Sequence, residues 1–334
     1  MDFRPLSDET ASVIPFLRIL RGGARVGPAF ALLAAAALSG CDRIKSALNP
    51  PVVDMGWQTD STLLASKPTL LMRVVRDDKG TRAVPIGTVG ARGLRALGMT
   101  PRGWRALDVN LLHSGNSVVP YRGSEPLAPV SITRGMWEGA PLDTLPGCNV
   151  PAPAAMMNVP DGVHLLTSGT VPLRAASNAI GSGELQEVLN VVNTLVAPSA
   201  GVSLSQMSRY ARTVAVVGTN ATSRPTIVVT YEDPAELPDS VTRIAERPRQ
   251  LIVVLDNGVY GYKPSLTFAD VSSSRIAPRR RFLGALDTNN DGKAELYFGL
   301  GPKIARAELV TYGYQYEGDA WLERFSYERT RCQG

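Results

Sequence analysis

Short apolar runs separated by glycine and proline are the feature that most limits what this chain can form. The 31 glycines and 25 prolines among 334 residues interrupt the sequence too often for many long helices. Runs rich in β-branched residues, such as 70–75, 213–217, 226–231 and 251–255, have the length and composition of strands. We therefore expect a mainly β protein of antiparallel sheets and hairpins with at least one amphipathic helix, and α+β is the alternative class.

That helix is expected over residues 183–196. Ser182 can cap its start, and Pro198 and Gly201 can end it. The apolar positions recur at helical spacing and form one stripe, which consists of Leu185, Val188, Leu189, Val192, Leu195 and Val196. Such a stripe predicts a helix packed on a sheet.

Two hairpins are expected in the C-terminal third. Asn257-Gly258 stands between two apolar runs and favours a tight turn there. Further along, a turn at Gly318-Asp319 separates two alternating aromatic patterns, which comprise Tyr312, Tyr314 and Tyr316 and then Trp321, Glu323, Phe325 and Tyr327. We interpret these aromatic side chains as core, with a sugar-stacking platform as the alternative.

Charge and motifs exclude several classes of function. The net charge of +5 is spread along the chain, and only Arg279-Arg280-Arg281 forms a cluster, so no nucleic-acid partner is expected. The sequence holds two histidines, His113 and His164, too few for a histidine-rich zinc site. It also lacks a Gly-x-Ser-x-Gly nucleophile elbow and a phosphate-binding loop.

The N-terminus carries a secretion pattern. Arg18, Arg21 and Arg25 precede an apolar run over residues 26–38, which is shorter than the roughly 20 residues of a membrane-spanning helix. The run ends in Leu38-Ser39-Gly40-Cys41, which resembles the lipobox of bacterial lipoproteins. This resemblance implies cleavage after Gly40 and lipidation of Cys41. The protein would then be lipid-anchored in the cell membrane or outer membrane and face an extracytoplasmic space.

This interpretation divides the chain into four parts. Residues 1–40 form the signal peptide, and residues 41–60 form a tether with little periodicity. Residues 61–180 form a β-rich N-terminal part. Residues 181–334 contain the helix, followed by a β-rich C-terminal part.

Two cysteines, Cys148 and Cys332, remain once Cys41 carries lipid. An even pair in an oxidising compartment predicts a disulfide bond between them. Two unpaired thiols are the alternative.

Residues 287–295 have the spacing of a calcium loop. Asp287, Asn289, Asp291 and Glu295 place oxygen-bearing side chains at positions 1, 3, 5 and 9, and the backbone carbonyl of Lys293 can add another ligand. Calcium is a hard cation that takes six to eight oxygen ligands. The alternative is a metal-free turn, because Asp, Asn and Gly also favour turns.

The flanking residues distinguish this loop from a helix-loop-helix calcium site. Such a site has its bidentate Glu at position 12, where this chain has Phe298. The flanking segments 282–286 and 296–298 have strand character. Residues 281–299 therefore resemble the calcium hairpin of FG-GAP and VCBS-type repeats. The hairpin occurs once, so the resemblance does not extend to a propeller.

Together these features predict a membrane-anchored envelope lipoprotein with a calcium-stabilised hairpin and a non-enzymatic role. It would bind a protein or glycan partner, or act as a scaffold. The rival prediction is an envelope hydrolase that acts on polysaccharide or peptide and contains structural calcium. A cleft gathering carboxylates, or His113 beside an acid and a hydroxyl, would favour the rival.

Overall fold

The computed structural model describes ten segments of the chain. The described residues are 68–77, 80–90, 93–97, 107–136, 138, 154–171, 179–233, 248–271, 279–301 and 309–328. All of them belong to the second of two units, which covers residues 54–334. The lipobox, Cys41, Cys148 and Cys332 lie outside the described residues, so lipidation and the disulfide remain predictions.

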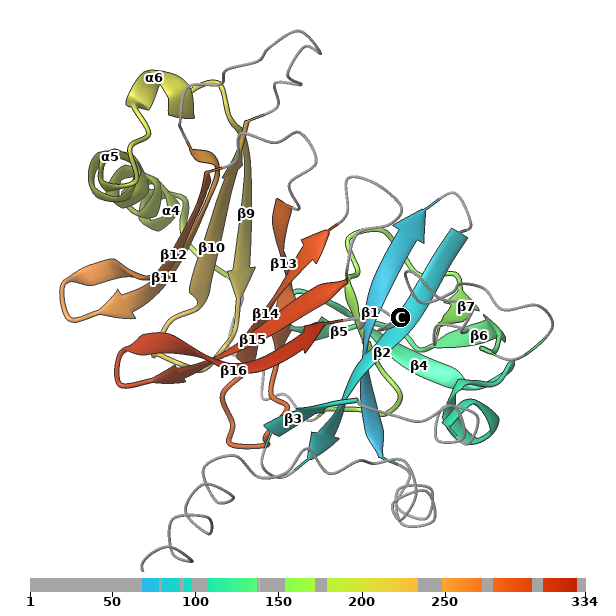
Figure 1. Cartoon of the computed structure of the whole chain (residues 1–334). Coiled ribbons are helices and arrows are strands. Elements are labelled where there is room, and N and C mark those ends of the chain that lie inside the picture. Colours follow the sequence, from blue (N-terminus) through green and yellow to red (C-terminus); the bar gives the residue numbers. More distant parts are fainter. Residues whose placement is uncertain are drawn as a thin grey trace, which may run out of the picture. The chain divides into compact units, whose positions relative to one another are not determined.

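The mainly β prediction is confirmed, and the first sheet is built from the N-terminal strands (Figure 1). Sheet 1 follows the order β1-β8-β4-β6-β7-β2-β3, and β5 pairs with β4. Direct pairing of β1 with β2 closes this path into a small barrel-like sheet. Its strands are β1 (Thr69–Asp77), β2 (Gly80–Gly90), β3 (Gly93–Ala96), β4 (Ser117–Arg122), β5 (Glu125–Pro126), β6 (Val130–Arg134), β7 (Ala155–Met157) and β8 (Leu165–Thr167). A π-helical turn, η1 (Asp108–Leu112), precedes β4.

The C-terminal strands form two antiparallel meanders, in which each strand pairs with its neighbour in sequence. Sheet 2 consists of β9 (Ala211–Val217), β10 (Thr226–Glu232), β11 (Pro248–Gly258) and β12 (Gly261–Val271). Sheet 3 consists of β13 (Arg279–Leu286), β14 (Glu295–Gly301), β15 (Val310–Glu317) and β16 (Ala320–Glu328).

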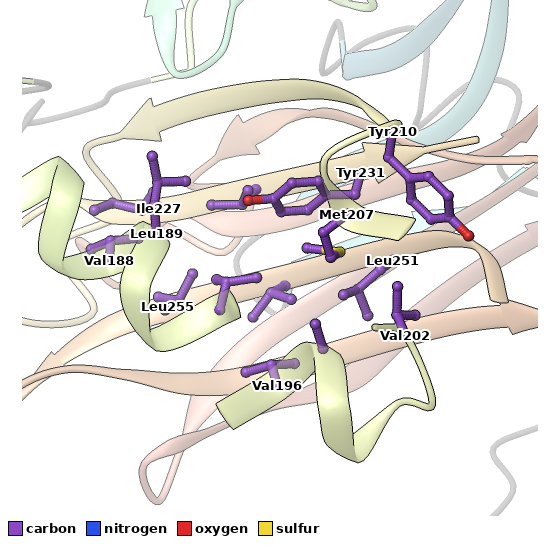
Figure 2. Packing of buried hydrophobic residues seen from close by; sticks show 14 of the residues in the cluster. Val188, Leu189, Val196, Val202, Met207, Tyr210, Ile227, Tyr231, Leu251 and Leu255 are labelled. Atoms are coloured by element: carbon purple, nitrogen blue, oxygen red, sulfur yellow. The ribbon is translucent and has the colours of Figure 1, made fainter. Parts of the chain in front are cut away.

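The helix lies against sheet 2, as Figure 2 shows. It runs as α4 (Ser182–Val191), a π-helical turn η2 (Val192–Val196) and α5 (Ala197–Ser199), and α6 (Leu204–Met207) follows. The predicted stripe is wrong at Leu195, which is 64% exposed, because the wider π turn shifts the positions that face the sheet. Gly181 takes the cap position expected for Ser182. The helix does not end at Pro198, which lies inside α5. Gly201, with a φ of 74°, follows the end of the helix.

Alternating side chains pack sheets 2 and 3 into successive layers. Ile227 and Val229 of β10 face the helix, whereas Val228 between them packs with Phe298 of sheet 3. The opposite face of sheet 3 packs Tyr297 against Leu71 of sheet 1. The inner strands are buried on both faces, and for this reason they read as unbroken apolar runs.

The aromatic residues of β15 and β16 are core, as interpreted, but they do not share one face. The pairing register shifts next to Tyr314. As a result, Trp321 packs toward sheet 2, and Phe325 and Tyr327 pack toward sheet 1. A bulge places an extra residue in one strand and so reverses the faces beyond it.

The β11–β12 hairpin turns two residues later than predicted. Asn257 pairs with Tyr262, Gly258 pairs with Gly261, and Val259-Tyr260 form the tip. Gly261 takes the positive φ of 105° that this connection needs. The Asn-Gly pair therefore lies within the strand.

Candidate metal centre

The predicted calcium loop joins β13 to β14. Leu286 pairs with Glu295 as the last rung of the two strands, and Asp287 is the first residue after β13. This register brings Asp287 and Glu295 together at the base of the loop. Asp291 lies in the loop between them. One carboxylate oxygen from each of the three residues lies within 4.8 Å of the others. This acidic triad can hold a metal ion.

The loop is shaped by its own side chains. The amide of Asp291 donates to Asn289 Oδ1 at 2.9 Å, and the amide of Lys293 donates to Asp291 Oδ1 at 2.8 Å. The amide of Gly292 donates to Asp287 Oδ2 at 2.9 Å. Asn290 and Gly292 have positive φ values of 59° and 85°, which these residue types tolerate. The Asn-Asp-Gly sequence thus curls the backbone around the acidic triad.

Two carboxylates of the triad are buried. Asp287 is 3% exposed and Glu295 is 7% exposed. The buried Asp287 Oδ1 has no hydrogen-bond partner, and no described cationic side chain forms an ion pair with the triad. A buried carboxylate oxygen without a partner is costly, so this atom is a strong sign that a cation belongs here.

Glu295 shows the same excess of negative charge. Its Oε2 accepts hydrogen bonds from the amide of Thr288 at 2.8 Å and from the Thr288 hydroxyl at 3.0 Å. Burial, with a smaller contribution from Asp287, nevertheless raises the pKa of Glu295 to about 7. A cation in the loop would offset this cost, because an opposite charge favours the ionised carboxylate.

The loop is also fixed from outside. Ala294 donates its amide hydrogen to the carbonyl of Thr219 at 2.7 Å, and Asn220 Nδ2 donates to the carbonyl of Gly292 at 3.0 Å. Gln315 Nε2 of β15 donates to Asp291 Oδ2 at 3.2 Å. The loop is therefore held by the connection between β9 and β10 as well as by sheet 3.

The structure brings together three of the five predicted ligands. Asn289 uses its side-chain oxygen in the hydrogen bond to Asp291, and Asn289 and the Lys293 carbonyl remain predictions as metal ligands. Phe298, at position 12, is fully buried in a hydrophobic cluster. Sequence reasoning missed Thr288 as the donor to Glu295, because a threonine in a turn carries no signal of its own.

Comparisons of the chain with protein-family models, with curated proteins and with solved structures found no match. The resemblance of the loop to calcium hairpins therefore rests on its own residues. Within the described residues, no helix has both the length and the apolar character needed to cross a membrane.

Proposed function

We propose that this protein is a lipid-anchored envelope protein with a non-enzymatic binding or scaffolding role, stabilised by calcium in the loop between β13 and β14. The observation that carries the calcium proposal is the buried Asp287 Oδ1, which lacks a protein partner. The lipobox sequence supports the anchor.

The chemistry of the ligands favours calcium over other common metals. The triad supplies only carboxylate oxygens, and no histidine or cysteine belongs to this cluster. Zinc sites usually contain nitrogen or sulfur ligands, and magnesium keeps several waters and binds few carboxylates. Calcium accepts many oxygens in flexible geometry, and carbonyl groups of the loop and water can complete its shell.

The position of the loop favours a structural role for the ion. Thr219 and Asn220 of the β9–β10 connection contact the loop directly. Calcium would therefore hold sheet 3 and the edge of sheet 2 together. An extracytoplasmic protein can use this arrangement where calcium is available.

The rival function, an envelope hydrolase, has less support from the residues around His113. The Ser114 hydroxyl donates to the carbonyl of Thr133 at 3.3 Å, and His113 Nδ1 lies 2.8 Å from the Ser114 carbonyl. Glu138 accepts the backbone amide hydrogens of Ser114 and Gly135. A nucleophile and its base are joined by a direct hydrogen bond, which these groups do not make, so the residues around His113 lend the rival no support.

The proposal has two tests on one preparation, the full-length protein expressed in a bacterium and purified from membranes. Mass spectrometry of the N-terminal peptide should find residue 41 as the first residue, with diacylglyceryl on its sulfur. The melting temperature should rise with millimolar calcium and fall with chelator. An intact precursor with a free Cys41 thiol would overturn the anchor, and a melting temperature insensitive to calcium would overturn the metal role.

A further inference from the structure

A second polar site lies away from the metal loop, between α4 and the β11–β12 hairpin. It is a surface pocket of about 340 Å³, near the lower end of the roughly 300–1,000 Å³ typical of small-ligand sites. Its lining combines two carboxylates, a guanidinium, an amide and a tyrosine with the hairpin backbone. The lining residues are Glu184, Glu187, Arg224, Asn257, Gly258, Val259, Gly261 and Tyr262.

The hairpin forms one wall because it extends beyond its neighbour strand. Pairing of β10 with β11 ends at Ile227 and Leu255, whereas β11 and β12 continue to Gly258 and Gly261. The hairpin therefore projects past β10 in Figure 1. The Glu187 side chain reaches this wall, since its Oε1 lies 2.8 Å from the position that a Cβ atom of Gly261 would take.

The polar groups of the pocket are only partly used by the protein. Arg224 pairs with Glu184. The Tyr262 hydroxyl donates to the carbonyl of Pro225 at 3.0 Å, and Asn257 Nδ2 makes a long 3.5 Å contact with Ser223. Among the described residues, Glu187 has no hydrogen-bond partner. Glu187 thus offers free acceptor oxygens, and the Arg224 guanidinium and the Asn257 amide keep N–H groups that these contacts do not use.

The tip of the hairpin, next to the pocket in sequence, carries two apolar side chains that folding does not explain. Tyr260 is 100% exposed and Val259 is 92% exposed, more than any other large apolar residue in the described part of the chain. Gly, Asn and Asp are the usual residues of such turns. An exposed tyrosine beside a polar pocket offers an aromatic face and a hydroxyl to a ligand.

We infer that this pocket binds a neutral saccharide, with Glu187, Asn257 and Arg224 bonding its hydroxyls and Tyr260 covering a sugar face. A polyol matches a wall of mixed donors and acceptors. The unpaired Glu187 disfavours an anionic ligand, and the polar lining disfavours an apolar one. This inference rests on the proposed binding role and specifies its partner as a glycan.

The same geometry favours binding over cleavage. Glu184 and Glu187 are three residues apart on one helix and so project from the same side. Glycoside hydrolases place their two carboxyl groups on either side of the scissile bond. Glu184 is also held by Arg224.

The test measures binding of chitobiose, cellobiose and maltose to the full membrane-purified protein, by ligand-observed NMR and calorimetry in a detergent without a sugar headgroup. At least one disaccharide should bind and remain intact. Glu187→Gln and Tyr260→Ala should each weaken binding about tenfold or more. The exposed Glu328→Gln, on β16, is the matched control and should leave affinity unchanged, and unchanged melting temperatures should show that every variant folds.

The other outcomes overturn the inference. These are no binding of any disaccharide at millimolar concentration, affinity unchanged in both pocket variants, preference for a trilysine peptide, or hydrolysis of the sugar. The calcium-dependent melting shift, measured on the same preparation, separates the two proposals. A calcium-dependent melting shift without sugar binding would overturn only the saccharide site. Sugar binding without a calcium-dependent melting shift would overturn only the metal role.

Discussion

The indole Nε1 of Trp321 donates a hydrogen bond of 2.6 Å to Oδ2 of Asp256, which is fully buried. This bond joins β16 of sheet 3 to β11 of sheet 2. Asp256 also accepts hydrogen bonds from the hydroxyls of Thr226 and Ser265. A buried charge is satisfied here by three neutral donors, one of which comes from the opposite sheet.

Removing that donor should loosen the junction of the two sheets. Trp321→Phe keeps an aromatic ring but leaves Asp256 short of one bond, and a hydrogen bond to a charged group contributes about 1.5–3 kcal/mol. We expect the free energy of unfolding in urea to fall by about that amount. Leu322→Ala, on the same strand but 41% exposed, is the control and should change it by less than about 1 kcal/mol. Equal losses in the two variants would contradict this role for Asp256.

A glycine at a strand irregularity gives a second prediction. Gly284 has a φ of 149°, and a Cβ atom there would lie 2.7 Å from the carbonyl oxygen of Gly123. That carbonyl accepts the amide hydrogen of Ala285 at 3.0 Å, so it cannot move away freely. Gly284→Ala should lower the free energy of unfolding by about 1–3 kcal/mol.

The matched control for this change is Gly183→Ala. Gly183 lies in the first turn of α4, and no atom lies within 4 Å of the position that a Cβ atom would take there. Alanine at this position should stabilise the protein by up to about 1 kcal/mol. Thermal unfolding of both variants checks the opposite signs, and a shift of the same sign would count against the steric argument.

His164 should make the stability of the protein depend on pH. Burial first, and then Arg76, Arg281 and Arg73, lower the pKa of His164 to about 4. The unfolded chain binds this proton below about pH 6.5, whereas the folded protein resists it until about pH 4. At this group the unfolded state therefore binds more protons in that window, so the contribution of His164 to stability falls as the pH drops through it.

The measurement compares urea unfolding at about pH 5 and about pH 7.5. His164→Gln should reduce the difference in unfolding free energy between these conditions by roughly 1–3 kcal/mol, with solvent screening favouring the lower end. Leu322→Ala, which changes no titratable group, is the control and should leave the difference close to that of the wild type. A pH dependence that survives His164→Gln unchanged would refute this assignment.

Local sequence patterns predicted much of the fold. The strands at 70–75, 226–231 and 251–255, the helix, and the strands flanking the metal loop are all found near the expected positions. These elements are determined by the spacing of apolar residues and by turn-forming residues, both of which are local in the sequence. The acidic triad was predictable for the same reason, because its three members lie within nine residues of chain.

Small changes of register could not be predicted from the sequence. A π turn exposes Leu195, and a bulge sends Trp321 and Phe325 to opposite sides of sheet 3. The π turn and the bulge each insert one extra residue into a regular helix or strand. The position of the insertion depends on packing across the sheet. The contact of Asn220 with the metal loop is likewise non-local, since it reaches Gly292, which lies 72 positions further along the chain.

Calcium titration of the wild-type protein and of Asp287→Asn tests the central claim most directly. By calorimetry, the wild type should bind one calcium ion per chain, and calcium at a hundred times Kd should stabilise it by about 2.7 kcal/mol. Asp287→Asn removes the negative charge of the buried carboxylate whose Oδ1 has no partner, so this variant should lose calcium binding. Without calcium, it should be at least as stable as the wild type. The exposed Asp161→Asn should bind calcium normally. A wild-type protein that binds no calcium, or an Asp287→Asn variant that binds it as tightly, would contradict the account.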